Sequence, residues 1–311
     1  MSESAADAPL HVLVPRAGFP HVPAMLAEAL PEVVVTRCAV TELADAVQSA
    51  DVLVPLLAPV TRAILANGRR LRLVQQWGSG LDRVDLEAAH ELGVPVKAAD
   101  PAVTGGAAAV AEWCVMAAIA LGRHVPAVQA AFPGGSAWGS PLGRTLRGGV
   151  ALVIGMGAVG RALVPLLQAL GATVTTVSAS YRGELAGVAG VGYDNLVPAL
   201  GRADWIFVCL RRPMQVPVLG AHELSSMRLG AFLINASRGH LVDEDAVNRL
   251  LREGHLGGAA LDVFRHEPMT GAESILTAPN LLATPHVAGV VESVERRVAA
   301  QVQLNVRRAR L

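Results

Sequence analysis

The sequence has few cysteines, few aromatic residues and no excess of charge of either sign. Its three cysteines, Cys38, Cys114 and Cys209, are far apart and lack C-x-x-C spacing. This pattern disfavours both a disulfide framework and a zinc site, because each needs cysteines in pairs or in ligand spacing. The histidines also lack ligand spacing, so we predict no metal. The expectation is three buried, reduced thiols in a cytoplasmic protein.

An imbalance of charge is also missing, since Lys plus Arg and Asp plus Glu number 26 each among 311 residues. Such balance gives no general attraction to nucleic acid or to an anionic membrane. The first residues, "MSESAADAPL", lack a basic segment followed by an apolar one, so no signal peptide is predicted. The longest apolar run, Val110 to Leu121, contains Glu112 and is too short to span a bilayer. We therefore expect a soluble protein in the cytoplasm.

Apolar residues, by contrast, make up 52% of the chain, and β-branched runs recur along it. The chain is longer than a single core usually supports, which predicts two domains. One series of runs begins at residues 11, 32, 51, 71 and 93, and a second begins at 149, 172, 204, 230, 257 and 280. Near-continuous apolar runs that alternate with helix-length segments predict parallel sheets covered on both faces.

We therefore predict an α/β fold of two doubly wound parallel-sheet domains, a Rossmann cofactor domain and a smaller flavodoxin-like substrate domain. One long helix is expected over 103–125 and a loop over 132–149. The stretch from Gly289 onward is helical in period, and we expect it to return to the first domain. The predicted limits are 1–101 with 286–311 for the discontinuous substrate domain, and 102–285 for the dinucleotide-binding domain.

The stretch "VALVIGMGAVGRALVPLLQALG" places Gly155, Gly157 and Gly160 in G-x-G-x-x-G spacing between an apolar run and an amphipathic one. Strand, glycine loop and helix in this order predict a dinucleotide site. Gly155 would permit the tight turn, Gly157 would let a pyrophosphate approach the backbone, and Gly160 would let the helix pack on the strand. N–H groups at the helix start, at Ala158 and Val159, would face the phosphates. The alternative is a glycine-rich turn that binds nothing.

The residues after the next strand bear on the choice between NAD and NADP. Folds that prefer NAD carry Asp or Glu there, about 20 residues further on. Ser178 stands at that place and Arg182 follows it, so the repulsion that would exclude a 2′-phosphate is missing. Arg211 and Arg212 follow the run "DWIFVCL" at another strand end, and guanidinium groups suit phosphate. The sequence therefore favours NADP over NAD, although solvated loop arginines would give the same pattern.

Three further segments place polar residues after apolar runs: "NASRG" with Arg238, "LDVFRHEP" with Asp262 and Glu267, and "ATPHVAG" with His286. Together with the glycine loop, they resemble the D-isomer-specific 2-hydroxyacid dehydrogenase family. The resemblance runs through nearly the whole chain, in the ordered segments "GSGLDRVD", "AAAVAEW", "GMGAVG", "INASRGHLVDEDAV", "LDVFRHEP" and "TPH".

The resemblance implies a role for each of these residues. Arg238 would bind the substrate carboxylate with its planar fork of donors, which lysine lacks. His286 would be the general acid for ketone reduction and the general base in reverse, and Glu267 would orient the imidazole and favour its protonated form. Asp262 would lie by the nicotinamide carboxamide. The border of the cofactor site would also include Ala236, Ser237 and Gly289.

The resemblance also implies contributions from outside the second domain. Family members place N–H groups of a G-x-G turn against the substrate carboxylate, and here these belong to Ser79 and Gly80. Closure of the two domains would then assemble the site. A symmetric homodimer is expected on the same ground, with the helix from Val103 to His124 in its interface.

Two departures from the family pattern bear on cofactor and substrate. The family often has "LPLT" after the strand that here reads "VCLRRPM", and the two arginines favour a phosphate-bearing cofactor. Pro55 and Leu56 stand where phosphoglycerate-type members commonly have a basic residue. We therefore expect glyoxylate, hydroxypyruvate or an apolar 2-oxo acid rather than phosphoglycerate. Phosphite oxidation is a further alternative that no particular residue supports.

Each proposed catalytic residue also has a plainer interpretation. Arg238 would be structural if it paired with Asp243 or Glu244, Glu267 would be an exposed residue, and His286 an ordinary loop histidine. A non-catalytic dinucleotide sensor, as some relatives of the family are, would fit that outcome. The ordered set of all three favours catalysis, because a sensor has no need for an acid beside a carboxylate clamp.

The remaining histidines and tryptophans are assigned no chemistry. His266 lacks the "TPH" context and is expected at the surface. Trp77 and Trp138 are expected to serve in packing.

Overall fold

The structure is a computed structural model that describes residues 9–135, 138–179, 184–185, 187–210 and 217–309. The chain forms two compact units, Met1–Thr104 with Glu292–Leu311, and Gly105–Val291. We call them the N-terminal unit and the central unit. The last helix of the chain therefore belongs to the unit in which the chain begins.

The N-terminal unit contains a parallel sheet of five strands in the order β2-β1-β3-β4-β5. This is the flavodoxin-like order, as predicted. Each strand falls within one of the apolar runs of the first series. The strands are β1 His11–Pro15, β2 Val34–Cys38, β3 Val52–Leu53, β4 Leu73–Gln75 and β5 Val96–Lys97.

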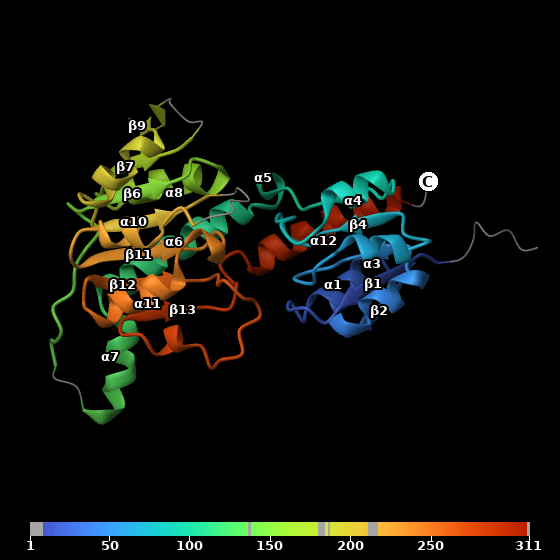
Figure 1. The fold of residues 1–311 in the computed structure, drawn as a ribbon, viewed down its shortest axis with the longest axis horizontal. Coiled ribbons are helices and arrows are strands. Elements are labelled where there is room, and N and C mark those ends of the chain that lie inside the picture. The colour runs from blue at the N-terminus through green and yellow to red at the C-terminus, as the bar shows by residue number, and fades with distance from the viewer. Residues whose placement is uncertain (1–8, 136–137, 180–183, 186, 211–216, 310–311) are drawn as a thin grey trace, which may run out of the picture. The chain divides into compact units, whose positions relative to one another are not determined.

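Helices connect and cover this sheet. They are α1 Val22–Ala29, α2 Leu43–Ala46, α3 Arg62–Asn67, α4 Leu86–Glu91, α5 Pro101–Thr104 and α12 Glu292–Arg308, with short 3₁₀ turns at Val40–Glu42 and Val47–Ser49. Thr61 and Asp85 begin α3 and α4 as side-chain caps, since each accepts a hydrogen bond from the backbone three residues on. The final helix α12 packs on α1 (Figure 1).

The central unit contains a larger sheet, in the order β13-β12-β11-β10-β6-β7-β9-β8. All neighbouring pairs are parallel except β8 with β9. Reversal of the strand order at β6 is the Rossmann arrangement, so the predicted fold class is confirmed. The strands are β6 Val150–Ile154, β7 Thr173–Val177, β8 Glu184–Leu185, β9 Val188–Val191, β10 Trp205–Val208, β11 Ala231–Asn235, β12 Leu256–Leu261 and β13 Leu281–Ala283.

Both faces of this sheet are buried, which explains the near-continuous apolar runs. Along β10, Trp205 and Phe207 belong to one hydrophobic cluster, and Ile206 and Val208 belong to the cluster on the opposite face. The covering helices are α6 Gly106–Gly122, α7 Val125–Ala131, α8 Ala158–Ala169, α9 Leu196–Leu200, α10 Ala221–Ser225 and α11 Glu244–Arg252. Short 3₁₀ turns lie at Phe132–Gly134, Tyr193–Asn195, Gly239–Leu241 and Ser274–Thr277.

The predicted helix over 103–125 is present but is interrupted at both ends. Gly105 has φ +76° and separates α5 from α6, and His124 has φ +53° and separates α6 from α7. Left-handed residues cannot continue a right-handed helix. Among the described residues of the predicted loop over 132–149, the only regular element is the short 3₁₀ turn at its start. Figure 1 shows α7 extending away from the body of the central unit.

The sequence did not predict the short strands β8 and β9, and one expectation about a single residue is wrong. No apolar run marked β9, because its sequence VAGV is short and contains Gly190, and glycine weakens a strand signal. Trp138 was expected to pack, yet it is 93% exposed, and its ring meets the ring of Phe132, also exposed, edge-on. Trp77, in contrast, is buried as predicted.

The three cysteines are free and buried, as predicted. Burial raises the pKa of the Cys209 thiol to about 12 and also raises the pKa values of Cys114 and Cys38. At neutral pH these groups are therefore uncharged apolar packing. In the described part of the chain, no single helix has the length and apolar character to cross a membrane; only the bent pair Gly106–Gly122 with Val125–Gly134 meets that standard, by length and composition alone.

Candidate active site

Three adjacent strands of the central unit carry the predicted catalytic residues at their carboxyl ends. Arg238 follows β11, Glu267 follows β12 and His286 follows β13, and these strands are neighbours in the sheet. Because the strands are parallel, their carboxyl ends lie along one edge. The strand order therefore brings three distant parts of the sequence to the same side of the sheet.

The turn after β11 is held by Asn235, the last residue of the strand, which is 1% exposed. Its Oδ1 accepts a hydrogen bond from the Ser237 N–H at 3.0 Å, and its Nδ2 donates to the Arg238 carbonyl at 3.0 Å. Ser237 Oγ donates to the Val208 carbonyl at 2.5 Å, which ties the turn to the neighbouring strand β10. The Arg238 side chain is half-buried, and its Nη1 donates to the Ser237 carbonyl at 2.7 Å. The backbone at Arg238 is thus fixed before any ligand arrives.

The residue after Arg238 is Gly239, and the space around it allows only glycine. A Cβ at this position would lie 1.9 Å from the carbonyl carbon of Phe264 and 2.5 Å from the nitrogen of Arg265. Only a residue without a side chain allows the two backbones to approach so closely. The Phe264–Arg265 peptide belongs to the loop that carries Glu267. The contact therefore sets the Arg238 turn directly against that loop.

Glu267 joins this loop to the histidine. Its Oε1 accepts a hydrogen bond from the Phe264 N–H at 2.9 Å, and its Oε2 lies 2.9 Å from His286 Nδ1. The Glu267 side chain is only 11% exposed, whereas that of His286 is 33% exposed. A largely buried carboxylate beside Nδ1 fixes the ring orientation and places a proton on that nitrogen. The other ring nitrogen, Nε2, is then the atom that can exchange a proton with a substrate.

Asp262 organises the segment that contains His286. It is 1% exposed, and its two carboxylate oxygens accept hydrogen bonds from Thr284 Oγ1 and from the N–H groups of Val287 and Ala288, at 2.6 to 2.9 Å. The His286 N–H also donates to the Asp262 carbonyl at 2.8 Å. His286 itself has φ +57°. The carboxylate therefore acts first as a brace for the histidine; a contact with nicotinamide stays a prediction.

Asp243 and Glu244, the acids with which a structural Arg238 was expected to pair, both contact Arg265. Asp243 caps α11 by accepting from the Ala246 N–H, and it also lies 3.7 Å from the Arg265 guanidinium. Glu244 accepts from the Arg265 N–H. Both acids thus have other partners than Arg238. His266 is exposed, as predicted.

The glycine loop has the shape that a dinucleotide requires. Gly155 has φ +103°, and a Cβ there would lie 2.7 Å from the Cys209 carbonyl oxygen; a Cβ on Gly160 would lie 2.2 Å from the Gly155 oxygen. A Cβ on Gly157, in contrast, would meet no atom of the described residues within 4 Å. Gly157 is the residue before α8, so the open side of the loop is the helix N-terminus, where Ala158 and Val159 present N–H groups. The residues present therefore fit a pyrophosphate.

The remaining predicted cofactor residues are placed less completely. Ser178 is buried at the carboxyl end of β7, where its N–H donates to the Val191 carbonyl of β9. Ala236 and Ser237 lie in the turn after β11, and Gly289 lies in the turn before α12, near Val110 of α6. Arg182, Arg211 and Arg212 lie outside the described residues.

Ser79 and Gly80 lie in the N-terminal unit, on the turn that follows β4, and both are half-buried. The turn lies at the carboxyl end of β4, an interior strand of the sheet, and open α/β sheets bind ligands at such ends. A Cβ added at the neighbouring Gly78 would meet no atom of the described residues within 4 Å. In the described part of the chain, no three His, Cys, Asp or Glu side chains gather in a way that would hold a metal.

Sequence reasoning missed the residues that brace the site. Asn235, Gly239 and Thr284 each hold a turn, and none was assigned a function. The glycine beside Arg238 and the asparagine at the strand end were visible signals, since both residue types mark turns. Their partners are distant in sequence, and these could not be read from the pattern.

Comparison with known proteins gives a consistent result. The family model described as "D-isomer specific 2-hydroxyacid dehydrogenase, NAD binding domain" matches residues 115–288. The (S)-sulfolactate dehydrogenase of Chromohalobacter salexigens is 34% identical over 80% of this chain and 81% of its own length. The D-3-phosphoglycerate dehydrogenase of Methanocaldococcus jannaschii is 30% identical over 86% of this chain, which spans about half (51%) of that relative's length. Glyoxylate reductases are also among the relatives, at 29–30% identity.

The comparison of structures agrees in fold. The crystal structure of the TT0316 protein from Thermus thermophilus superposes with a TM-score of 0.84 at 27% identity, covering 96% of each chain.

We predict that Gly239→Ala unfolds more easily than the unchanged protein, because a new methyl group would collide with the Phe264 peptide. The collision involves backbone on both sides, so the free energy of unfolding should fall by about 3 kcal/mol. Guanidinium titration followed by circular dichroism measures this change. Gly134→Ala is the matched control, since a Cβ there would meet nothing within 4 Å in the described structure. Equal stability of the two variants would show that the close approach is not needed.

Proposed function

The chain belongs to the D-isomer specific 2-hydroxyacid dehydrogenase family, and on that premise we propose that it interconverts a small 2-oxo acid and its D-2-hydroxy acid by hydride transfer with NAD(P)H. One observation carries the proposal: the 2.9 Å hydrogen bond between Glu267 and His286, on the strand ends next to the Arg238 turn. An acid–base pair beside an arginine is what reduction of a 2-oxo acid requires of a protein.

The proposed division of labour follows from the chemistry of each group. Arg238 binds the substrate carboxylate through two parallel hydrogen bonds and so orients the 2-oxo group. His286, protonated and held by Glu267, gives a proton from Nε2 to the 2-oxo oxygen; in the reverse direction it takes the hydroxyl proton. The N–H groups of Ser79 and Gly80 are proposed as further donors to the carboxylate. The nicotinamide, when bound, supplies or accepts the hydride.

The cofactor is proposed to rest on the glycine loop, with its pyrophosphate at the open side of Gly157. The choice between NAD and NADP depends on the residues after β7 and β10. Ser178 supports NADP, because no carboxylate at this place repels a 2′-phosphate. Arg182, Arg211 and Arg212 support it by their charge. We therefore propose that NADP is slightly favoured.

The substrate is proposed to be glyoxylate, hydroxypyruvate or an apolar 2-oxo acid. Pro55 and Leu56, after β3, offer no cation to a phosphate on the substrate. The relatives include enzymes named for substrates with a phosphate or sulfonate group as well as glyoxylate reductases, so the family alone does not select among them. Burial of the three free thiols supports the cytoplasm as the proposed location.

We predict that Arg238→Ala lowers kcat/KM for the preferred 2-oxo acid by about 10²–10³-fold, because it removes both hydrogen bonds to a charged substrate group. The dissociation constant of the reduced cofactor should change by less than about threefold. Arg238→Lys is the matched variant: it retains the charge without the fork, and it should recover only part of the loss. Steady-state oxidation of NADPH and NADH with a panel of 2-oxo acids measures the first quantity, and fluorescence titration measures the second.

The same assay decides between catalysis and the non-catalytic sensor. If the unchanged protein binds both reduced cofactors yet consumes neither with any 2-oxo acid, the sensor replaces the proposed reaction. Equal loss of cofactor binding and turnover in Arg238→Ala would instead make the arginine structural.

We further predict that replacing Arg211 and Arg212 together by Gln weakens NADPH binding about tenfold more than NADH binding. Each arginine would lose a charge-assisted hydrogen bond to the 2′-phosphate, which NADH lacks. Fluorescence titration with both reduced cofactors measures the two dissociation constants. Arg202→Gln, at an exposed position before β10, controls for the change in net charge. Parallel weakening of both cofactors would remove the preference for NADP.

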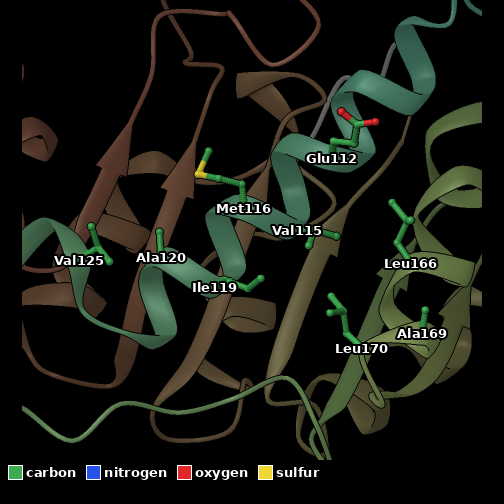
Figure 2. A pocket seen from close by; sticks show the side chains of 9 residues that line it. All are labelled: Glu112, Val115, Met116, Ile119, Ala120, Val125, Leu166, Ala169 and Leu170. Atoms are coloured by element: carbon green, nitrogen blue, oxygen red, sulfur yellow. The ribbon is translucent and has the colours of Figure 1, made fainter.

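A homodimer is proposed as the assembly, with α6 in its interface. Met116 and Ile119 of α6 are each nearly half exposed, which is unusual for large apolar side chains. With Val115, Leu166 and Leu170 they line an open groove of about 680 Å³ between α6 and α8 (Figure 2). A second copy of the chain is the proposed occupant, as expected for soluble oligomers with self-complementary surfaces.

We predict that Ile119→Asp shifts the protein from dimer to monomer, because a charge in an apolar interface is left without its hydration. Light scattering coupled to size-exclusion chromatography measures the mass of both proteins. Leu229→Asp is the matched control, since Leu229 is 72% exposed and lies away from the groove residues. A monomeric unchanged protein, or equal dissociation of both variants, would argue against this interface.

A further inference from the structure

A buried carboxylate in the N-terminal unit belongs to no part of the site described so far. Glu295, on α12, is 8% exposed. Its Oε2 accepts a hydrogen bond from the indole Nε1 of Trp77 at 2.6 Å and lies 2.9 Å from His21 Nε2. Burial of a carboxylate is costly unless donors replace the lost water, and here two donors converge on one oxygen.

Trp77 stands immediately before the turn that contains Ser79 and Gly80. The turn has little side-chain mass of its own, because Gly78 and Gly80 flank its single serine. The Gly78 carbonyl accepts a hydrogen bond from the Ala99 N–H at 3.0 Å, and the residues before the turn hold its other end. Trp77 is 3% exposed, so its indole is an anchor inside the unit rather than a wall of a pocket.

The residues before Trp77 are also tied down by side chains. Gln76 Nε2 donates to the Leu56 carbonyl after β3, and Gln76 Oε1 accepts from the Trp77 N–H, both at 2.9 Å. Gln75 Oε1 accepts from Asn305 Nδ2 of α12 at 2.9 Å. The end of β4 is thus bonded to α12 twice, once through Gln75 and once through Trp77.

Of these two bonds to α12, that of Trp77 is nearer to the turn, and it has a particular geometry. The indole N–H is a single donor with one direction, so its acceptor fixes the ring in its plane. If the acceptor is removed, a buried N–H is left without a partner, and the ring must move or admit water. Either response displaces Gly78 and the two residues that follow it.

We infer that Glu295 is a positioning residue for the substrate carboxylate: through the Trp77 indole it holds the turn so that the Ser79 and Gly80 N–H groups point at one place. This inference rests on the proposed function, in which those N–H groups bind the carboxylate. His21 is the second donor that keeps the Glu295 carboxylate in place. It is the residue directly before α1, so the first and last helices of the unit meet at this oxygen.

The test is a double-mutant cycle on the full-length protein with reduced cofactor bound. Glu295→Leu and Trp77→Phe each break the indole bond, and each should raise KM for the 2-oxo acid about tenfold while kcat changes less than about threefold. The double variant should be no worse than Glu295→Leu, because Trp77→Phe removes only a contact that Glu295→Leu has already lost. Glu295→Gln retains an oxygen that accepts the indole N–H, and it should stay within about threefold of the unchanged protein.

A control on the same helix separates this effect from loss of helix docking. Gln301 Oε1 accepts from the Asp100 N–H, a bond of α12 to a segment beyond β5. Gln301→Leu should leave KM unchanged. Hydrogen exchange supplies a readout without turnover: amides of residues 76–80 should exchange faster in Glu295→Leu than in Glu295→Gln or Gln301→Leu. Additive effects in the cycle, or equal exchange in all three variants, overturn the inference.

Binding of oxamate, an unreactive analogue of a 2-oxo acid, separates failure of this inference from failure of the proposed reaction. Calorimetry with the cofactor-loaded protein should show about tenfold weaker oxamate binding in Glu295→Leu. Binding to the unchanged protein without any turnover would overturn the reaction and leave the positioning role intact. Oxamate affinity that is equal in Glu295→Leu and the unchanged protein, or absent from both, would overturn the positioning role.

Discussion

The contact between Gly239 and the Phe264 peptide is the constraint on which the candidate active site depends. It brings the backbone after β11 against the loop after β12, closer than any side chain would permit. Arg238 is the residue directly before Gly239. Glu267 lies three residues after Phe264, on the other side of the contact. Since Glu267 in turn accepts from the Phe264 N–H and holds His286, one backbone approach aligns a guanidinium with an acid–base pair. Such alignment is a large part of what an enzyme contributes to a reaction whose redox step belongs to a cofactor.

In each of the two units, a buried carboxylate accepts hydrogen bonds that hold a nearby segment in place. Asp262 accepts three hydrogen bonds from the segment 284–288, and Glu295 accepts from Trp77 and His21. Asp262 bonds to the segment that carries His286, and Glu295 bonds to Trp77, which precedes the turn with Ser79 and Gly80. A carboxylate suits this task because it accepts several donors at once and is costly to leave unpaired, so the donors stay in place. Apolar packing holds the sheets together, whereas these acids set the directions of single groups.

The sequence was sufficient for all strands but β8 and β9 and for the order of the strand ends, and it failed where long-range or irregular geometry decides. Apolar runs located the strands because both faces are buried, and parallel order then placed Glu267 and His286 at neighbouring ends. The strand β9 was not predicted, because it is short and contains Gly190, and so it forms no apolar run. The bond from Trp77 to Glu295 joins residues 218 positions apart, so no local pattern contains it. The helix break at Gly105 was not predicted, because the alanine-rich residues after it favour one continuous helix.

The backbone of His286 gives a further reason to regard this edge as a site of chemistry. A non-glycine residue at φ +57° costs free energy, and such conformations persist only where the surroundings over-determine them. Here the Asp262 carboxylate accepts from Thr284 Oγ1 before the histidine and from the Val287 and Ala288 N–H groups after it. The Asp262 carbonyl accepts from the N–H of His286 itself. Glycine or asparagine would adopt this backbone at lower cost, so packing alone does not explain the imidazole. A dinucleotide sensor needs the glycine loop before α8, but it has no need for a strained histidine held by a buried glutamate. The presence of both features agrees with the proposed proton transfer at this edge and not with a sensor.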